Sequence, residues 1–174
     1  MLIIQHPKEV EHPFNTGKIV ALCLSNIELA VTEVLDEALT RKIEKSNSVL
    51  LYPDTDLGST LVDSVDSVDS NLLDSISARN HQEIEQLVVL DASWRKSKRM
   101  LFANPCLQKL PRLSLDGCEA SQYQIRRTAT KGALSTIESV TQALTIIEPN
   151  SDFAPLLRPF KRMIQLQLSF KADQ

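Results

Sequence analysis

Short runs of apolar residues recur along this chain, and each is bounded by polar residues or by proline. The clearest runs are residues 1–5, 48–53 and 87–90, and RLSL at 112–115 is a weaker one. Runs of this length between turn signals are typical of strands that are buried on both faces. Because such strands occur in parallel sheets covered by helices, the pattern predicts an α/β fold with a mostly parallel sheet flanked by helices.

Between these runs, apolar positions recur every three or four residues, which is the period of an amphipathic helix. The helical stretches are 34–45, 94–103, 134–147 and 153–168, whereas 15–24 fits either a helix or a buried strand. The clearest helix start lies at Ser135 and Glu138, which have the S-x-x-E spacing of a capping box. Pro159 should kink or restart the last helix, because it lacks a backbone N–H.

Two of the predicted strands end at residues that are suited to a ligand site. Asp91 follows the run 87–90, and Tyr52 and Pro53 close the run 48–53. In parallel α/β sheets, ligands collect beyond the carboxyl ends of the strands. These two strand ends are therefore the first candidates for a functional site.

Asp91 opens the segment DASWRKSKRML, and its carboxylate has two possible roles. At a strand end it would be partly desolvated, which makes a carboxylate a better base. Just before a helix, an aspartate is at least as well suited to accept a backbone N–H as the helix cap. Trp94, the only tryptophan, is either a core residue or a platform for a ligand. The pattern alone leaves both pairs of alternatives open.

Charge is distributed unevenly, although the net charge is only −3. Residues 52–85 contain eight acids against one base, and residues 91–131 contain nine bases against three acids. The basic stretch is either a solvated face or a contact surface for a polyanion. Four of its bases lie near the start of the helix predicted at 94–103, where the helix dipole disfavours positive charge. This placement hints at a compensating anion.

A second polar group follows the first predicted strand and consists of His6, Glu9, Asn15 and Thr16. Its H-x-x-E spacing can bind a metal or act as an acid/base pair, but it is also common in surface segments. The strand candidate YQIRR, at 123–127, carries two arginines that would either grip a phosphate or carboxylate or pair with a surface acid.

The chain has 174 residues, of which 43% are hydrophobic and 24% charged, as expected of one globular domain. No apolar run has the length of a membrane-spanning helix, and the first residues lack the basic region of a signal peptide. Three scattered cysteines fit reduced thiols in a cytoplasm and have no zinc-ligand spacing. We expect a cytoplasmic protein without a metal, with an acidic surface loop over 54–71.

The order of these segments is more specific than any one of them. DASW at 91–94 is followed by RKSKRML, LPRLSL, SQYQIRR and GALSTIESV, and is preceded by HPKEVEHPFNTGK and LLYP. Together they resemble the DTW-domain family over most of the chain, from His6 to about Leu168. Ser93 stands where the family has threonine, and the cysteine cluster that members often carry ahead of the first strand is absent. We therefore expect residues 1–174 to form a single DTW domain.

Members of this family are tRNA-uridine aminocarboxypropyltransferases. The resemblance thus implies transfer of the 3-amino-3-carboxypropyl group from S-adenosyl-L-methionine to N3 of a tRNA uridine, which releases 5′-methylthioadenosine. It also implies a SPOUT-like fold with a C-terminal trefoil knot, a rare exception to the rule that chains are unthreaded. Two alternatives are an RNA methyltransferase of the same fold that uses the same donor, and a non-catalytic RNA-binding module.

The resemblance also implies roles for particular residues. Asp91 is expected to accept the N3 proton as a general base, and Trp94 to line the donor's sulfonium through apolar and cation–π contact. The residues expected around S-adenosylmethionine are Leu51, Tyr52, Pro53, Leu90, Ser93, Trp94, Leu134, Ser135 and Thr136. The residues expected to meet tRNA phosphates are Arg95, Lys98, Arg99, Arg126 and Arg127.

Overall fold

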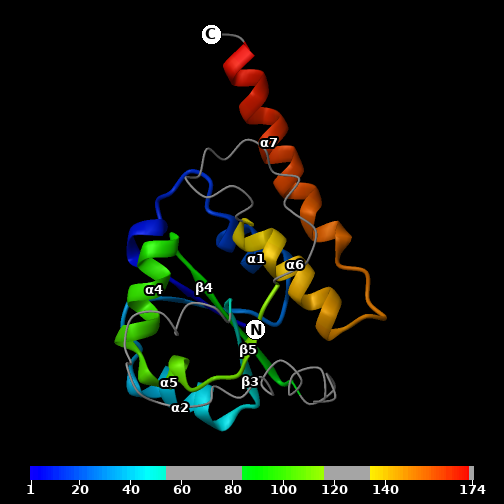
Figure 1. The fold of residues 1–174 in the computed structure, drawn as a ribbon. Coiled ribbons are helices and arrows are strands. Elements are labelled where there is room, and N and C mark those ends of the chain that lie inside the picture. The colour runs from blue at the N-terminus through cyan, green and yellow to red at the C-terminus, as the bar shows by residue number, and fades with distance from the viewer. Residues whose placement is uncertain (54–83, 116–133, 173–174) are drawn as a thin grey trace, which may run out of the picture.

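The computed structural model describes residues 1–53, 84–115 and 134–172 and is built around a sheet of parallel strands (Figure 1). In these residues the sheet has five strands in the order β2-β1-β4-β3-β5, and every neighbouring pair is parallel. The strands are β1 Leu2–Gln5, β2 Glu28–Val31, β3 Ser48–Leu51, β4 Gln86–Asp91 and β5 Arg112–Leu113. The predicted α/β fold with a parallel sheet is confirmed.

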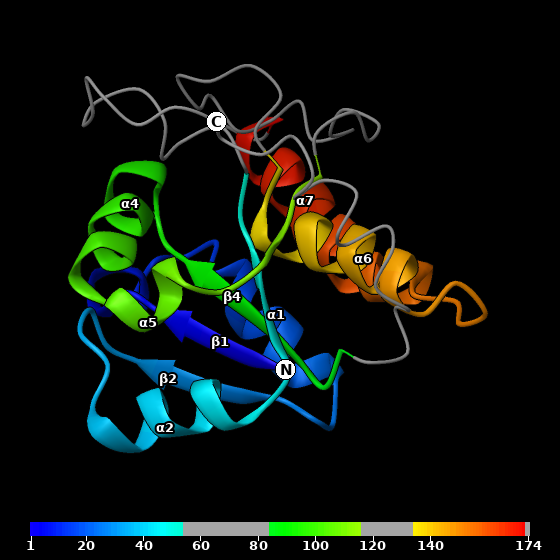
Figure 2. The ribbon, with the colours of Figure 1, turned by 60° about the horizontal axis from the view of Figure 1, so that its bottom comes forward.

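Helices cover both faces of this sheet (Figure 2). One face is covered by α1 Thr16–Cys23, α6 Thr136–Ile147 and α7 Leu157–Ala172. The other face is covered by α2 Glu37–Lys45, α4 Trp94–Ala103 and α5 Pro105–Gln108. Short 3-10 turns precede α1 and α7, namely η1 Pro7–Glu9 and η4 Ala154–Leu156.

Each central strand supplies side chains to both hydrophobic cores, because successive residues of a strand point to opposite faces. In β1, Ile3 packs with residues of α1 and α6, whereas Leu2 and Ile4 pack with residues of α2 and α4. All three are fully buried. Full burial of one such side chain stabilises the fold by about 1.5–3 kcal/mol, so the two cores fix the helices against the sheet.

The predicted apolar runs correspond to β1, β3, β4 and β5, and the ambiguous stretch 15–24 forms α1. The edge strand β2 was not predicted, because its residues are only partly buried and pair with a neighbour on one side. The helix predicted at 34–45 begins instead at Glu37. Asp36 sets this start, since its carboxylate accepts the backbone N–H of Leu39 at 2.8 Å.

The kink or restart that Pro159 predicted is not at Pro159 itself, because the α-helix begins two residues earlier. The 3-10 turn η4 ends at Leu156, α7 begins at Leu157, and Pro159 lies in the first turn of α7. A missing backbone N–H there removes no helical hydrogen bond. The expected acidic loop over 54–71 and the strand candidate 123–127 lie outside the described residues.

The carboxyl ends of the central strands bring distant parts of the chain together. Gln5, the last residue of β1, lies beside Asp91, the last residue of β4, in the parallel register. Tyr52 follows β3 at the same edge, and α4 and α6 begin there at Trp94 and Thr136. Both predicted strand ends thus lie at one edge of the sheet.

The predicted capping box at the start of α6 is present and suggests a stability test. Glu138 is buried, and its carboxylate accepts the Ser135 backbone N–H at 2.9 Å and the Ser135 hydroxyl at 2.7 Å. Replacing Ser135 with alanine should lower the unfolding free energy by about 1 kcal/mol, measured by chemical denaturation. Ser139→Ala, one turn further along α6, is the control and should change it by less than half as much. Equal losses of unfolding free energy in the two variants would mean that the Ser135 cap does not stabilise α6 specifically.

Candidate active site at the carboxyl ends of β1, β3 and β4

Asp91 is the polar centre of this edge of the sheet. Its side chain is 7% exposed, and each carboxylate oxygen accepts a hydrogen bond. Gln5 Nε2 donates to Oδ2 at 2.6 Å, and the Thr136 hydroxyl donates to Oδ1 at 2.6 Å. The alternative that Asp91 caps the helix after it is wrong, because the N-cap of α4 is Ser93. The carboxylate bridges β1 and α6 instead.

Helix α1 approaches the same carboxylate closely through Gly17. A Cβ atom at Gly17 would lie 2.4 Å from Asp91 Oδ2, closer than any real contact allows, so only glycine fits the observed arrangement. Gly17 is the second residue of α1, and Thr136 is the first residue of α6. Two helix N-termini therefore lie beside the carboxylate, where their partial positive charge stabilises an anion.

Asn15 joins Gln5 to the start of α1. Its Oδ1 accepts the Lys18 backbone N–H at 2.8 Å, which makes it the N-cap, and also accepts Gln5 Nε2 at 3.0 Å. Its Nδ2 donates to the Glu9 carbonyl at 3.0 Å. Asn15 and Glu9 of the second polar group therefore hold the chain between β1 and α1.

Two aromatic residues, one after each of the neighbouring strands β3 and β4, stack on each other at this edge of the sheet. The rings of Tyr52 and Trp94 are stacked, with centroids 5.3 Å apart and planes at 12°. The Arg112 guanidinium carbon lies 5.0 Å from the centroid of the Tyr52 ring. Tyr52 is 4% exposed but Trp94 is 52% exposed, so Trp94 is not a core residue. Its outer face is available to a ligand.

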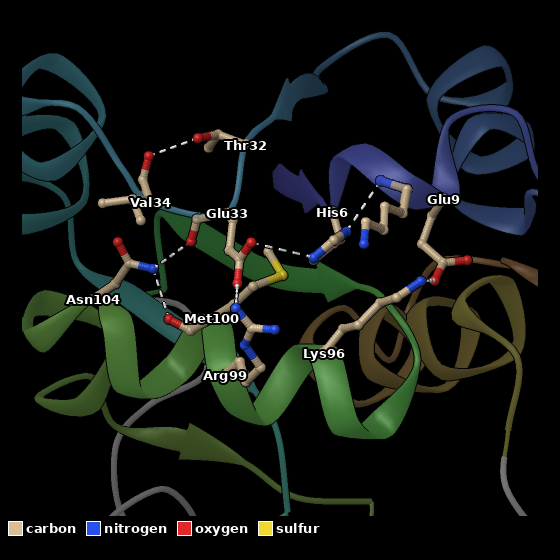
Figure 3. Close-up of polar contacts among 10 residues, drawn as sticks. His6, Glu9, Thr32, Glu33, Val34, Lys96, Arg99, Met100 and Asn104 are labelled. Atoms are coloured by element: carbon tan, nitrogen blue, oxygen red, sulfur yellow. Dashed lines mark hydrogen bonds and ion pairs between the residues drawn. The ribbon is translucent and has the colours of Figure 1, made fainter.

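Acidic side chains hold the basic helix α4 in place (Figure 3). Lys96 Nζ lies 2.7 Å from Glu9 Oε1, and Arg99 lies 2.9 Å from Glu33 Oε1. Buried His6 lies 3.5 Å from the same Glu33 through Nε2. The charge pattern hinted at an anion that compensates the four bases near the start of α4. For two of these bases, Lys96 and Arg99, the compensating anions are acids of this chain.

Asn104 fixes the segment that carries Glu33 against α4 (Figure 3). It is buried, and its Nδ2 donates to the carbonyls of Glu33 and Met100 at 3.0 and 2.6 Å. Its Oδ1 accepts the Leu35 N–H at 2.8 Å. The sequence pattern predicted only that a helix ends at residue 103, whereas the fold uses the whole amide group of Asn104.

The structure brings the predicted donor-site residues to one edge of the sheet. Leu51, Tyr52 and Pro53 lie at the end of β3. Leu90 lies near the end of β4, Ser93 is the N-cap of α4, and Trp94 is its first residue. Leu134, Ser135 and Thr136 open α6, where Thr136 contacts Asp91. The sequence reading missed Gln5, Gly17 and Arg112. The position of Gln5 at the end of a buried strand was the available signal for it.

Of the five residues expected to contact tRNA phosphates, the structure describes the three on α4. Arg95 is exposed on α4, Lys98 is half-buried, and Arg99 is exposed but paired with Glu33. Arg126 and Arg127 lie outside the described residues. Within residues 1–53, 84–115 and 134–172, no three His, Cys, Asp or Glu side chains are grouped so that they could hold a metal ion. None of the helices in this described part is both long and apolar enough to span a membrane.

A parallel sheet covered by helices on both faces defines a protein of the α/β class, and the buried carboxylate and exposed aromatic ring lie at the edge where such proteins bind their ligands. The model of the DTW domain matches residues 1–168, and this chain belongs to that family, as its motifs predicted.

Several curated relatives are similar along nearly the whole chain. The tRNA-uridine aminocarboxypropyltransferase 2 of Macaca fascicularis is 27% identical over 99% of this chain and 56% of its own length. The protein of that name from Drosophila melanogaster is 27% identical over 97% of this chain and 64% of its own length. The tRNA-uridine aminocarboxypropyltransferase A of Arabidopsis thaliana is 26% identical over 98% of this chain and 71% of its own length. This chain thus spans about half the length of the mammalian relative, and no solved structure matches it.

The ion pair between Glu9 and Lys96 predicts how stability depends on pH. Burial raises the pKa of Glu9, but the hydrogen bond and charge of Lys96 and the Ser93 backbone N–H lower it more, so the net pKa is below its ordinary value. A lowered pKa in the folded state adds stability above the pKa of the unfolded chain, and this stability is lost as pH falls through the folded value.

Glu9→Gln should therefore lower the unfolding free energy by about 1 kcal/mol at neutral pH. The difference from wild type should shrink as pH falls below about 4.3, the ordinary value for glutamate. Denaturant titrations at several pH values measure it. Glu11→Gln, at an exposed neighbouring acid, should have little effect at any pH. A Glu9 effect that is constant between pH 3 and pH 7 would contradict the electrostatic origin.

Proposed function

We propose that this chain transfers the 3-amino-3-carboxypropyl group from S-adenosyl-L-methionine to N3 of a uridine in tRNA. The observation that carries the proposal is the DASW block, in which Asp91 is buried and fixed while Trp94, three residues later, presents an exposed aromatic face. Membership of the DTW domain family and the names of the relatives support it.

The transfer requires one nucleophile and one base. Uridine N3 forms a bond to the donor's methylene carbon next to sulfur, and the bond from that carbon to sulfur breaks. The bonding electron pair remains on sulfur, so the positive sulfonium becomes the neutral thioether of 5′-methylthioadenosine. The N3 proton passes to the Asp91 carboxylate and then to solvent. Because a sulfonium is a good leaving group, orientation of the reactants supplies most of the remaining acceleration.

The described residues at this edge fit such a donor. The exposed face of Trp94 can attract the sulfonium by cation–π and apolar contact, and Tyr52 behind it holds the ring in place. The backbone after β3 and β4 and the start of α6 offer polar groups for the nucleoside and amino acid portions. Gln5 and Thr136 each use one acceptor position of Asp91, and a carboxylate oxygen has more than one, so a position remains for the N3 proton.

For the fold in detail, we propose the SPOUT-like arrangement with a C-terminal trefoil knot, which the family membership supports. We also expect this chain to work in the cytoplasm, where its tRNA substrate is available.

A single assay tests the function against its rivals. The protein is incubated with S-adenosylmethionine and unmodified tRNA, and the small-molecule product and tRNA nucleosides are identified by mass spectrometry. Methylthioadenosine together with aminocarboxypropyl-uridine supports the proposal. Adenosylhomocysteine would identify a methyltransferase, and tRNA binding without either product would identify a binding module.

Asp91→Ala should abolish most of the activity while the protein remains folded. Loss of a general base is expected to reduce kcat by about 10²-fold or more, measured as methylthioadenosine release. Asp36→Ala is the matched control, because Asp36 is an aspartate that caps α2 away from the site. It should cost about 1 kcal/mol of stability and leave kcat unchanged. Near-normal turnover in Asp91→Ala would remove Asp91 from the mechanism.

Arg95, which is exposed on α4, and Lys98, which is half-buried there, should contact tRNA phosphates. Replacing Arg95 and Lys98 with glutamine should flatten the slope of log K for tRNA against log salt by roughly 0.7–0.9 for each contact that is lost. Arg41→Gln with Lys45→Gln, two exposed bases on α2, is the control and should leave the slope unchanged. An unchanged slope in the α4 variant would mean that tRNA follows another path on the protein.

A further inference from the structure

We infer that Gln5 is a positioning residue of the active site, which holds the Asp91 carboxylate in the orientation that proton transfer requires. This inference rests on the proposed function and deepens it. Gln5 and Asp91 end neighbouring parallel strands in register, and the amide donates to Asp91 Oδ2 at 2.6 Å. Gln5 is 2% exposed, so water does not compete for this hydrogen bond.

The hydrogen-bond network defines which way the Gln5 amide faces. The Lys18 backbone N–H can only donate, so the Asn15 atom that it contacts is the oxygen Oδ1. The Gln5 atom that contacts the same oxygen at 3.0 Å is therefore the nitrogen. That nitrogen has two hydrogens, one directed to Asn15 and the other to Asp91. The N-cap of α1 thus sets the direction in which Gln5 donates.

Gly17 limits the carboxylate from the side of α1. A Cβ atom there would lie 2.4 Å from Asp91 Oδ2 and 2.5 Å from its Cγ, so the helix backbone packs directly against the group. Thr136 holds the other oxygen, Oδ1, from α6. With Gln5 on Oδ2, the carboxylate has fixed contacts at both oxygens and cannot rotate without losing one of them. Such fixing lowers the reorganisation needed at the moment of reaction.

A second buried glutamine in the same sheet provides a matched comparison. Gln86 begins β4 and is 8% exposed, and its Oε1 accepts the Ser48 hydroxyl at 3.0 Å. It lies at the amino end of the strand whose carboxyl end is Asp91, roughly 16 Å away along the chain. Both glutamines satisfy buried polar groups, but only Gln5 contacts the proposed base. Substitutions at Gln86 therefore measure the loss of folding stability alone, without a change at the proposed base.

The test compares Gln5→Leu and Gln5→Glu with the same two changes at Gln86. For each variant, kcat and KM are measured from methylthioadenosine release, kcat is followed against pH, and folding is checked by thermal denaturation. Both Gln5 variants should lose about 10- to 100-fold in kcat, with KM for S-adenosylmethionine changed by less than about threefold. The Gln86 variants should lose stability but keep kcat.

The pH profile adds a readout that a structural role would not move. Among the described residues of the wild type, the two side chains that donate hydrogen bonds to the Asp91 carboxylate, Gln5 and Thr136, are uncharged. Gln5→Glu places a second carboxylate beside Asp91, and two such groups disfavour simultaneous ionisation. The acid limb of the kcat profile should therefore move to higher pH in Gln5→Glu, but not in Gln86→Glu.

Gly17→Ala is an independent second variant, because it displaces the Asp91 carboxylate while the Gln5 amide remains. It should reproduce the loss of kcat with little change in KM, and it keeps the inference testable if a Gln5 variant fails to fold. Normal kcat in folded Gln5 and Gly17 variants would overturn the role of Gln5, as would equal losses at Gln86. Wild-type protein that releases no methylthioadenosine would overturn the proposed function itself, and with it this inference.

Discussion

The buried carboxylate of Asp91 is the constraint on which the geometry of the site depends. A charge removed from water is costly unless hydrogen bonds replace its hydration. At Asp91 these bonds come from β1 through Gln5 and from the start of α6 through Thr136, while α1 packs against it at Gly17. Elements that lie far apart in the sequence must therefore take one relative arrangement to satisfy a single side chain.

The DASW block at 91–94 places its first and last residues in opposite environments. Asp91 is 7% exposed and Trp94 is 52% exposed, because the chain leaves the sheet between them and turns into α4. The carboxylate is thereby shielded and fixed, while the indole of Trp94 remains exposed to solvent. Stacking on Tyr52 prevents the indole from moving freely, so the open face is also an ordered one. The proposed transfer, from a large charged donor beside a fixed base, would benefit from both properties.

Helix α4 shows that part of a basic segment is used by the fold itself. Glu9 and Glu33 hold Lys96 and Arg99, which ties the helix to the segments after β1 and β2. Arg95 is exposed on the same helix and remains the clearer candidate for a phosphate contact. The number of bases in the sequence therefore overstates the positive charge that this helix can offer to RNA.

Local patterns in the sequence predicted the features that depend on local forces. The apolar runs predicted the central strands, because burial on both faces requires continuous apolar side chains, and S-x-x-E predicted the cap of α6, because its two members lie one turn apart. The motif order predicted the family. The edge strand β2 was missed, since it is only half-buried and its pairing with β1 is a long-range interaction.

The partners of the central residues were decided only by the tertiary structure. Asp91 fits a helix cap or a catalytic base equally well in the sequence, and its contacts with Gln5 and Thr136 cross 86 and 45 residues of chain. Gly17 is one glycine among four until α1 packs on the carboxylate. The sequence determined which side chains are available and where the central strands form. Parallel pairing of β1 with β4 decided which of those side chains meet, because register between distant strands is set by packing of the whole sheet rather than by any local pattern.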